Sequence, residues 1–209
     1  MILRYSQETV QQAARVVAGG GLIAFRTDTF YGLGVDPFNR GAVQRIKELK
    51  GREVNKPILI VISDRDQVEE FVAEPSRSFQ LLSKDFWPGA LTLIGSARPE
   101  VPAEITAGTV TIGVRLPNDE RVRALVRACG GALTATSANP SHEAPATSAE
   151  MVKNYFGEKI DLIIDDGESQ TDSPSTVVDA SGVQASLIRE GVIPWAKIES
   201  RLRTERRPG

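Results

Sequence analysis

Hydroxyl side chains and cations are concentrated in two neighbouring segments of this chain. Residues 26–34 are Arg-Thr-Asp-Thr-Phe-Tyr-Gly-Leu-Gly, and Lys50, Arg52 and Lys56 follow shortly afterwards. An arginine offers a planar fork to a phosphate, and a lysine offers a point charge. These cations come just before an apolar segment, which indicates that they line a rim and not a free surface. Together the two segments predict a site for a polyanion such as a nucleotide.

Each segment also has a purely structural interpretation. Thr27 and Thr29 could be β-forming residues beside a hairpin turn in which Gly32 and Gly34 relieve backbone strain. The cations of residues 50–56 could complement the macrodipole at the end of a helix. Spacing alone does not choose between a structural turn and a binding site.

A second polar cluster follows an apolar segment further along the chain. Thr136, Ser137 and Asn139 come directly after an expected strand at residues 132–135. Open α/β sheets place ligand-binding groups at strand ends. Ser137 and Asn139 could also simply cap a turn before the proline that follows. If the two clusters converge, they form a phosphate-binding cleft with hydroxyl and amide donors.

Three more polar residues stand at the ends of expected strands. Arg115 ends the strand at residues 109–116, Ser175 follows a proline, and Arg189 stands at a strand exit. A cation at a strand end is often part of a structural salt bridge, so each of these signals is weak when taken alone.

Charge and residue counts limit the classes of function. The net charge of −2 excludes an indiscriminate nucleic-acid binder, so any anion site must come from local clustering. One histidine, His142, excludes histidine-rich metal sites and is interpreted as a solvated loop residue. One cysteine, Cys129, excludes an internal disulfide, fits a reducing compartment and is interpreted as a small apolar residue.

Targeting signals are not evident in the sequence. The N-terminus lacks a signal-peptide pattern, and no apolar stretch approaches the roughly 18 residues that a membrane span needs. We therefore expect a cytoplasmic protein that does not contact a membrane.

Helix-like and strand-like segments alternate along the chain. Strands are expected near residues 22–25, 57–62, 91–94, 110–116, 132–135, 162–164, 176–178 and 187–188. Helices are expected after the capping residues Ser6, Asn39, Asp64, Ser76 and Asp119, and at a capping box formed by residues 147–150, which begins at Thr147. The pattern predicts an α/β fold of the α+β type, a three-layer structure with a twisted mixed sheet of about seven strands and helices on both sides.

The chain is expected to contain one domain at residues 1–193 and a basic tail at residues 194–209. The tail is rich in arginine and poor in core residues, so we expect it to be frayed. Residues 140–148 lack apolar periodicity and are expected to form a mobile loop that closes over a bound nucleotide.

The order of these motifs closely resembles that of the YrdC/Sua5 family, the L-threonylcarbamoyladenylate synthases. The similarity runs from about Gly21 to Gly191. The matching pieces are T-D-T-F-Y-G-L at residues 27–33, the pair Lys50 and Arg52, N-K-P at 55–57, F-W-P-G-A-L-T at 86–92, G-V-R-L-P at 113–117, the pair Ser137 and Asn139, P-S-T-V-V-D at 174–179, and R-E-G at 189–191. The resemblance implies a YrdC-like three-layer fold with a concave cationic cavity.

The resemblance also implies an enzymatic activity. The family is a group of nucleotidyltransferases that form threonylcarbamoyl-AMP and pyrophosphate from L-threonine, bicarbonate or CO2, and ATP. The product serves the t6A37 modification of tRNA. The resemblance also implies Mg²⁺ held mainly by phosphate oxygens and a possible contact with tRNA. Because the chain resembles the short, single-domain kind, we also expect separate threonylcarbamoyl-transferase proteins to act on the product. We expect no metal site built from protein ligands.

The residue roles implied by the resemblance form three overlapping groups. The expected catalytic residues are Lys50, Arg52 and Ser137. The expected threonine-binding residues are Thr29, Tyr31, Arg115, Thr136 and Ser175. The expected nucleotide-binding residues are Lys50, Arg52, Lys56, Ser137, Asn139 and Arg189. Arg26 departs from the family pattern, because a proline is usual before T-D-T. Without the proline we expect a softer turn, but no ligand group is lost.

Two other classes of function remain open from the residues. A cationic concave face could bind tRNA or double-stranded RNA through its phosphates without catalysis. The protein could also be an inactive regulator or scaffold that binds a nucleotide and makes no product. Threonine-dependent consumption of ATP separates the enzyme from both alternatives.

Overall fold

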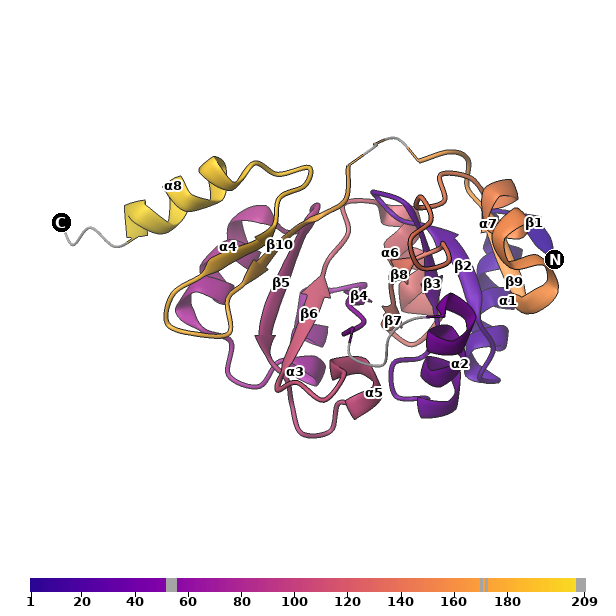
Figure 1. Ribbon diagram of the computed structural model, residues 1–209, viewed down its shortest axis with the longest axis horizontal. Coiled ribbons are helices and arrows are strands. Elements are labelled where there is room, and N and C mark those ends of the chain that lie inside the picture. The colour runs from indigo at the N-terminus through magenta and orange to yellow at the C-terminus, as the bar shows by residue number, and fades with distance from the viewer. Residues whose placement is uncertain (52–55, 170, 172, 206–209) are drawn as a thin grey trace.

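The computed structural model describes residues 1–51, 56–169, 171 and 173–205, and its strands form two mixed sheets (Figure 1). The five-stranded sheet has the order β1-β9-β2-β3-β8, and the six-stranded sheet has the order β11-β10-β5-β6-β4-β7. In Figure 1 the labelled strands of the six-stranded sheet run from β10 on the left to β4 and β7 near the middle, and the strands β2, β3 and β9 of the five-stranded sheet lie to the right.

The five-stranded sheet is parallel on one side of β2 and antiparallel on the other. Its strands are β1 (Ile2–Arg4), β9 (Leu162–Asp165), β2 (Ile23–Arg26), β3 (Tyr31–Gly34) and β8 (Thr136–Ser137). β9 runs parallel to both β1 and β2, whereas β3 runs antiparallel to β2 and to β8. The β2–β3 pair is a hairpin, and the T-D-T motif forms its turn.

The six-stranded sheet is also mixed. Its strands are β11 (Ser186–Arg189), β10 (Thr176–Asp179), β5 (Leu91–Ser96), β6 (Thr111–Arg115), β4 (Ile60–Ile62) and β7 (Ala132–Thr134). β10 pairs with β5 and β4 pairs with β6 in parallel, and the other pairs are antiparallel. Residues 132–137 connect the two sheets, because β7 belongs to one sheet and β8 to the other.

Helices cover the sheets, and most begin at a capping side chain. They are α1 (Gln7–Ala18), α2 (Arg40–Lys50), α3 (Val68–Phe71), α4 (Arg77–Phe86), α5 (Ala103–Thr106), α6 (Glu120–Ala128), α7 (Ala149–Phe156) and α8 (Trp195–Glu205), with 3-10 turns at Arg65–Gln67 and Gly157–Lys159. The caps predicted at Ser6, Asn39, Ser76 and Asp119 are confirmed, because each side chain accepts a backbone N–H of the first turn. In α7 the cap is Ser148, one residue later than Thr147, the first residue of the predicted capping box.

Two apolar clusters form the core. The larger cluster includes Leu33 from the five-stranded sheet and Ile60 and Val114 from the six-stranded sheet. The smaller cluster lies under α1 and α6, and the partly buried Cys129 packs against it. Burial raises the pKa of the Cys129 thiol to about 12, in agreement with its interpretation as an apolar residue.

The predicted mixed α/β class is confirmed, but the prediction of a single sheet of about seven strands is wrong. Eleven strands lie among the described residues, divided between the two sheets. The strands β1, β3 and β8 were not predicted. Each has at most four residues, and the glycines of β3 and the polar residues of β8 hide the usual strand pattern.

The expectation of a frayed tail is wrong for residues 195–205, which form α8. Ile198 and Leu202 are buried, and Lys197 lies 5.9 Å from the centre of the Phe86 ring in α4. Arg201 also pairs with a carboxylate of α4, at Asp85. Two apolar residues four positions apart, together with these contacts to α4, therefore dock this short helix, although its sequence is dominated by charge.

None of the helices within the described residues has the length and hydropathy needed to cross a membrane.

Candidate functional site

A cavity of about 570 Å³ contains most of the residues that the sequence singled out. Its lining includes Thr27, Thr29, Phe30, Tyr31, Gly32, Lys50, Lys56, Pro57, Leu59, Val61, Arg115, Ala135, Thr136, Ser137, Asn139, Ser141, His142, Pro145, Pro174, Ser175 and Arg189. These residues come from both sheets and from the connection between them. The predicted convergence of distant polar segments into one concave site is therefore observed.

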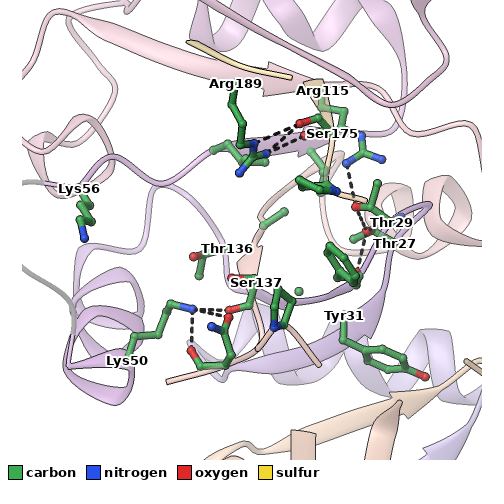
Figure 2. Close-up of a pocket in the computed structure, with 18 of the residues that line it drawn as sticks. Thr27, Thr29, Tyr31, Lys50, Lys56, Arg115, Thr136, Ser137, Ser175 and Arg189 are labelled. Atoms are coloured by element: carbon green, nitrogen blue, oxygen red, sulfur yellow. Dashed lines mark hydrogen bonds between the residues drawn. The ribbon is translucent and has the colours of Figure 1, made fainter. Parts of the chain in front are cut away.

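Two arginines occupy the same wall of this cavity (Figure 2). Arg115, at the end of β6, is buried, and its guanidinium forms an ion pair with Asp28. Its Nη1 donates to Thr29 Oγ1 at 3.2 Å, and its Nε has no hydrogen-bond partner among the described residues. The hairpin turn thus holds Arg115 from one side and leaves one donor of the fork unused.

Arg189, at the end of β11, is anchored by the backbone of Ser175. Its Nη2 and Nε donate to the Ser175 carbonyl oxygen at 2.9 and 3.3 Å. Burial lowers the pKa of Arg189, and the positive charge of Arg115 lowers it further. Two guanidinium groups that repel one another in a partly desolvated cavity create a place where an anion is favoured.

The Ser175 side chain is fixed below Arg189. It is buried, and its Oγ lies 3.0 Å from Thr92 Oγ1 in β5. Thr92 belongs to the motif at residues 86–92, so this contact joins two segments that sequence order alone could not connect.

The turn at residues 27–30 is closed by its own threonines. Thr27 Oγ1 donates to the Phe30 carbonyl oxygen at 2.7 Å and accepts the Thr29 backbone N–H at 3.1 Å. Arg26 supports the turn from behind through ion pairs of 3.0 Å with Asp119 and 2.9 Å with Asp166. In place of a soft turn, the arginine ties the end of β2 to α6 and to the loop after β9.

Lys50 lies across the cavity from the two arginines (Figure 2). It is buried at the end of α2, and its Nζ donates to the carbonyl oxygens of Ser137 and Asn139. The expectation that Lys50 faces nucleotide phosphates differs from this arrangement, in which the ammonium points at carbonyl oxygens. The lysine holds the 137–139 segment in position beside the cavity.

Asn139 is also committed to the protein. Its Oδ1 lies 3.3 Å from Lys50 Nζ, and its Nδ2 donates to the carbonyl oxygens of Pro140 and Glu143 at 3.0 and 2.6 Å. The side chain therefore shapes the start of the 140–148 loop. The Ser137 hydroxyl, in contrast, lines the cavity and makes no hydrogen bond with the described residues.

Tyr31 is one of the expected threonine-binding residues, but its hydroxyl does not face the cavity. The residue is fully buried, its ring points away from the cavity (Figure 2), and its hydroxyl donates to the Gly167 carbonyl oxygen at 2.7 Å. Burial raises the pKa of Tyr31 to about 12. Its place at the cavity follows from its position in β3, where alternate side chains face opposite sides of the sheet.

The remaining predicted residues divide between the rim, the wall and the part of the chain that is not described. Lys56 is exposed at the rim, and Thr136 lines the wall. Arg52 lies outside the described residues. His142, interpreted as a solvated loop residue, is exposed as expected but also lines the cavity. Its position just after Asn139 was the signal that could have identified it.

Comparisons with known proteins agree with this architecture. A family model named for Sua5, YciO and YrdC, with the description "Telomere recombination", matches residues 15–191. The chain is 38% identical over 196 residues to the threonylcarbamoyl-AMP synthase of Pyrococcus abyssi, covering 94% of this chain and 58% of that protein. It is 36% identical over 171 residues to the threonylcarbamoyl-AMP synthase of Idiomarina loihiensis, covering 80% of this chain and 91% of that protein.

A solved structure shows the same relationship. The crystal structure of P. abyssi Sua5 complexed with L-threonine aligns with a TM-score of 0.92 at 36% identity, covering 97% of this chain and 60% of that chain. The chain thus spans less than two thirds of the archaeal relative and most of the bacterial one.

Proposed function

This chain belongs to the Sua5/YciO/YrdC family, and we propose that it is an L-threonylcarbamoyladenylate synthase. It joins L-threonine, bicarbonate or CO2, and ATP to give threonylcarbamoyl-AMP and pyrophosphate. Two features support the proposal: the relatives that carry the name threonylcarbamoyl-AMP synthase, and a cavity that both sheets build from the motif residues.

The observation that carries the proposal is the pair formed by Arg115 and Arg189. Both guanidinium groups face one cavity, and no acidic group contributes to the lowered pKa of Arg189. An anion between them would relieve their repulsion and replace lost hydration. The carboxylate of threonine or of its N-carboxy derivative has the size and charge for this position, and the hydroxyls of Thr29 and Ser175 stand beside it.

The nucleotide is proposed to occupy the opposite side, where the 137–139 segment borders the cavity. The Ser137 hydroxyl and Thr136 line this wall, and Lys56 supplies a cation at the rim. Arg52 is proposed to contact the phosphates as well. Lys50 is assigned the role of a positioning residue, because its ammonium is occupied by the carbonyl oxygens of the same segment.

The chemistry requires charge control more than acid–base catalysis. The threonine amine adds to CO2 with loss of a proton, or condenses with bicarbonate with loss of water. An oxygen of the resulting N-carboxylate then attacks the α-phosphorus of ATP. The bond to the β-phosphate oxygen breaks, and pyrophosphate leaves with its electron pair. An anion must approach a polyphosphate in this step, so fixed cations and fixed geometry supply the rate enhancement.

Mg²⁺ is proposed to accompany ATP and to be held mainly by phosphate oxygens. The described lining residues offer hydroxyl and amide oxygens, and no cluster of three His, Cys, Asp or Glu residues occurs within the described ranges. Transfer of the product to tRNA is proposed to depend on separate threonylcarbamoyl-transferase proteins, with a possible direct contact between this chain and tRNA.

The proposal is tested by mass spectrometry of the nucleotide products. Incubation with threonine, bicarbonate, ATP and Mg²⁺ is expected to yield threonylcarbamoyl-AMP, and omission of any one substrate is expected to abolish it. ATP binding without an adenylate product, under conditions in which the protein is folded, would overturn the proposed activity.

A further inference from the structure

His142 is the only histidine of the chain, and it lines the candidate site. It belongs to the segment that Lys50 and Asn139 anchor. The Ser141 backbone N–H donates to the Lys50 carbonyl oxygen at 3.1 Å, and Asn139 Nδ2 donates to the Glu143 carbonyl oxygen at 2.6 Å. The backbone on either side of His142 is therefore fixed at the cavity wall on the side of Ser137.

The backbone conformation of His142 is unusual for its residue type. Its φ is 73°, and the Glu143 N–H donates to the Pro140 carbonyl oxygen at 3.2 Å, so His142 is the third residue of a tight turn. A positive φ at this position is a feature of type II turns, where glycine or asparagine is ordinary. The only other described non-glycine residue with positive φ is Ala107, which ends α5. Strained residues of this kind concentrate at functional sites.

The charged residues that line the cavity are cationic, and Asp28 behind them pairs with Arg115. Lys50 comes from α2, Lys56 from the segment before β4, Arg115 from β6 and Arg189 from β11. The described lining residues include no carboxylate, and the nearest acidic residue along the chain is Glu143. From α7, the Tyr155 hydroxyl donates to the Ala144 carbonyl oxygen at 3.0 Å and so supports the loop from behind. An imidazole added to this wall extends a surface suited to a polyanion.

We propose that His142 is a nucleotide-binding residue whose imidazole donates a hydrogen bond to a phosphate of the bound nucleoside triphosphate and adds positive charge there when protonated. The proposal rests on the proposed function for the identity of the ligand. It assigns to His142 a binding role that strengthens when the imidazole is protonated, because a charged donor makes a stronger hydrogen bond to a phosphate.

The test compares the affinity for Mg²⁺–ATP at about pH 6 and about pH 8, measured by isothermal titration calorimetry. The variants are His142→Asn, His142→Gly and His142→Lys. Asparagine and glycine tolerate the left-handed backbone, so they remove the imidazole without adding strain. Lysine keeps a positive charge at both pH values. Protonation of ATP itself affects all four proteins equally, and AMP serves as a ligand with a single phosphate.

The wild-type protein is expected to lose about threefold to tenfold more affinity than His142→Asn as the pH rises, since charged hydrogen bonds contribute on this scale. His142→Gly should behave like His142→Asn, His142→Lys should bind ATP with little pH dependence beyond that of the ligand, and AMP should show a smaller difference. Equal pH profiles for wild type and His142→Asn, in a protein that still forms the adenylate, would overturn the role of His142 alone. Loss of adenylate formation by the wild type would instead reject the proposed function.

Discussion

Lys50 and Asn139 are 89 positions apart, yet Lys50 Nζ donates to the Asn139 carbonyl oxygen at 2.7 Å and lies 3.3 Å from its Oδ1. The same ammonium also contacts the Ser137 carbonyl oxygen. A buried ammonium that replaces its hydration with three protein oxygens is an organising element. It fixes the wall on which Ser137 and His142 are presented to the cavity.

Replacing Lys50 with methionine is expected to lower both stability and turnover. The substitution leaves carbonyl oxygens at Ser137 and Asn139 without a donor, which costs about 1–3 kcal/mol in the free energy of unfolding. Turnover should fall further than the loss of folded protein explains, because the wall is no longer held. Urea unfolding and initial rates of pyrophosphate release measure the two effects.

Lys56→Met is the matched control for this substitution. Lys56 is exposed at the rim, so its replacement should change stability by less than about 0.5 kcal/mol. A Lys50 variant as stable as the Lys56 variant would contradict the positioning role of Lys50.

Tyr31→Phe is expected to retain turnover within about twofold. The Tyr31 hydroxyl donates a hydrogen bond to the Gly167 carbonyl oxygen. Its removal should therefore lower the free energy of unfolding by about 1 kcal/mol. A loss of threonine affinity with unchanged stability would show that the hydroxyl binds ligand after all.

The same pair of proteins has a predicted pH signature. Burial raises the pKa of Tyr31 from 10.0 to about 12. The advantage of wild type over Tyr31→Phe should therefore be constant below pH 10, where both folded and unfolded chains are neutral at this position. Between about pH 10 and 12 the unfolded chain ionises first, so the advantage should shrink as the pH rises.

Arg189→Gln is expected to weaken anion binding without destabilising the empty protein by more than about 1 kcal/mol. Burial and the positive charge of Arg115 lower the pKa of Arg189. Folding therefore disfavours the charged form of this side chain. Glutamine removes this penalty and keeps one donor for the Ser175 carbonyl. The measurement is the rise in melting temperature caused by saturating threonine and ATP, which should shrink in the variant.

Arg115 and Asp28 are expected to be energetically coupled. Both are largely buried, so Arg115→Met leaves a carboxylate without its partner and should cost about 3 kcal/mol. A double-mutant cycle with Asp28→Asn should return a coupling of about 1–3 kcal/mol. Additive effects of the two substitutions would mean that the ion pair does not hold Arg115 in place.

Helix caps and most strands could be predicted from the sequence because their signals are local. Ser6 and Ser76 precede amphipathic segments, and each accepts a backbone N–H of the following turn. The division into two sheets could not be predicted, because it depends on strand β8 of two residues pairing with β3. Such pairing leaves no periodic pattern.

Residue types also indicated the site better than they indicated the direction of each side chain. Lys50 is at the cavity as expected, but the accepting groups that turn its ammonium inward are backbone carbonyl oxygens, which no sequence motif reveals. Tyr31 faces away because of its register in β3, a strand that was not predicted. His142 was undervalued because its turn brings it to the wall through contacts of its neighbours.

The central claim is that one cavity brings threonine, bicarbonate and ATP together for a single condensation. Its most direct test supplies isotopically labelled bicarbonate with threonine and ATP and follows the label and the pyrophosphate together. The account predicts labelled threonylcarbamoyl-AMP in an amount equal to the pyrophosphate released. Pyrophosphate release without label in an adenylate, or no threonine-dependent release at all, would contradict it.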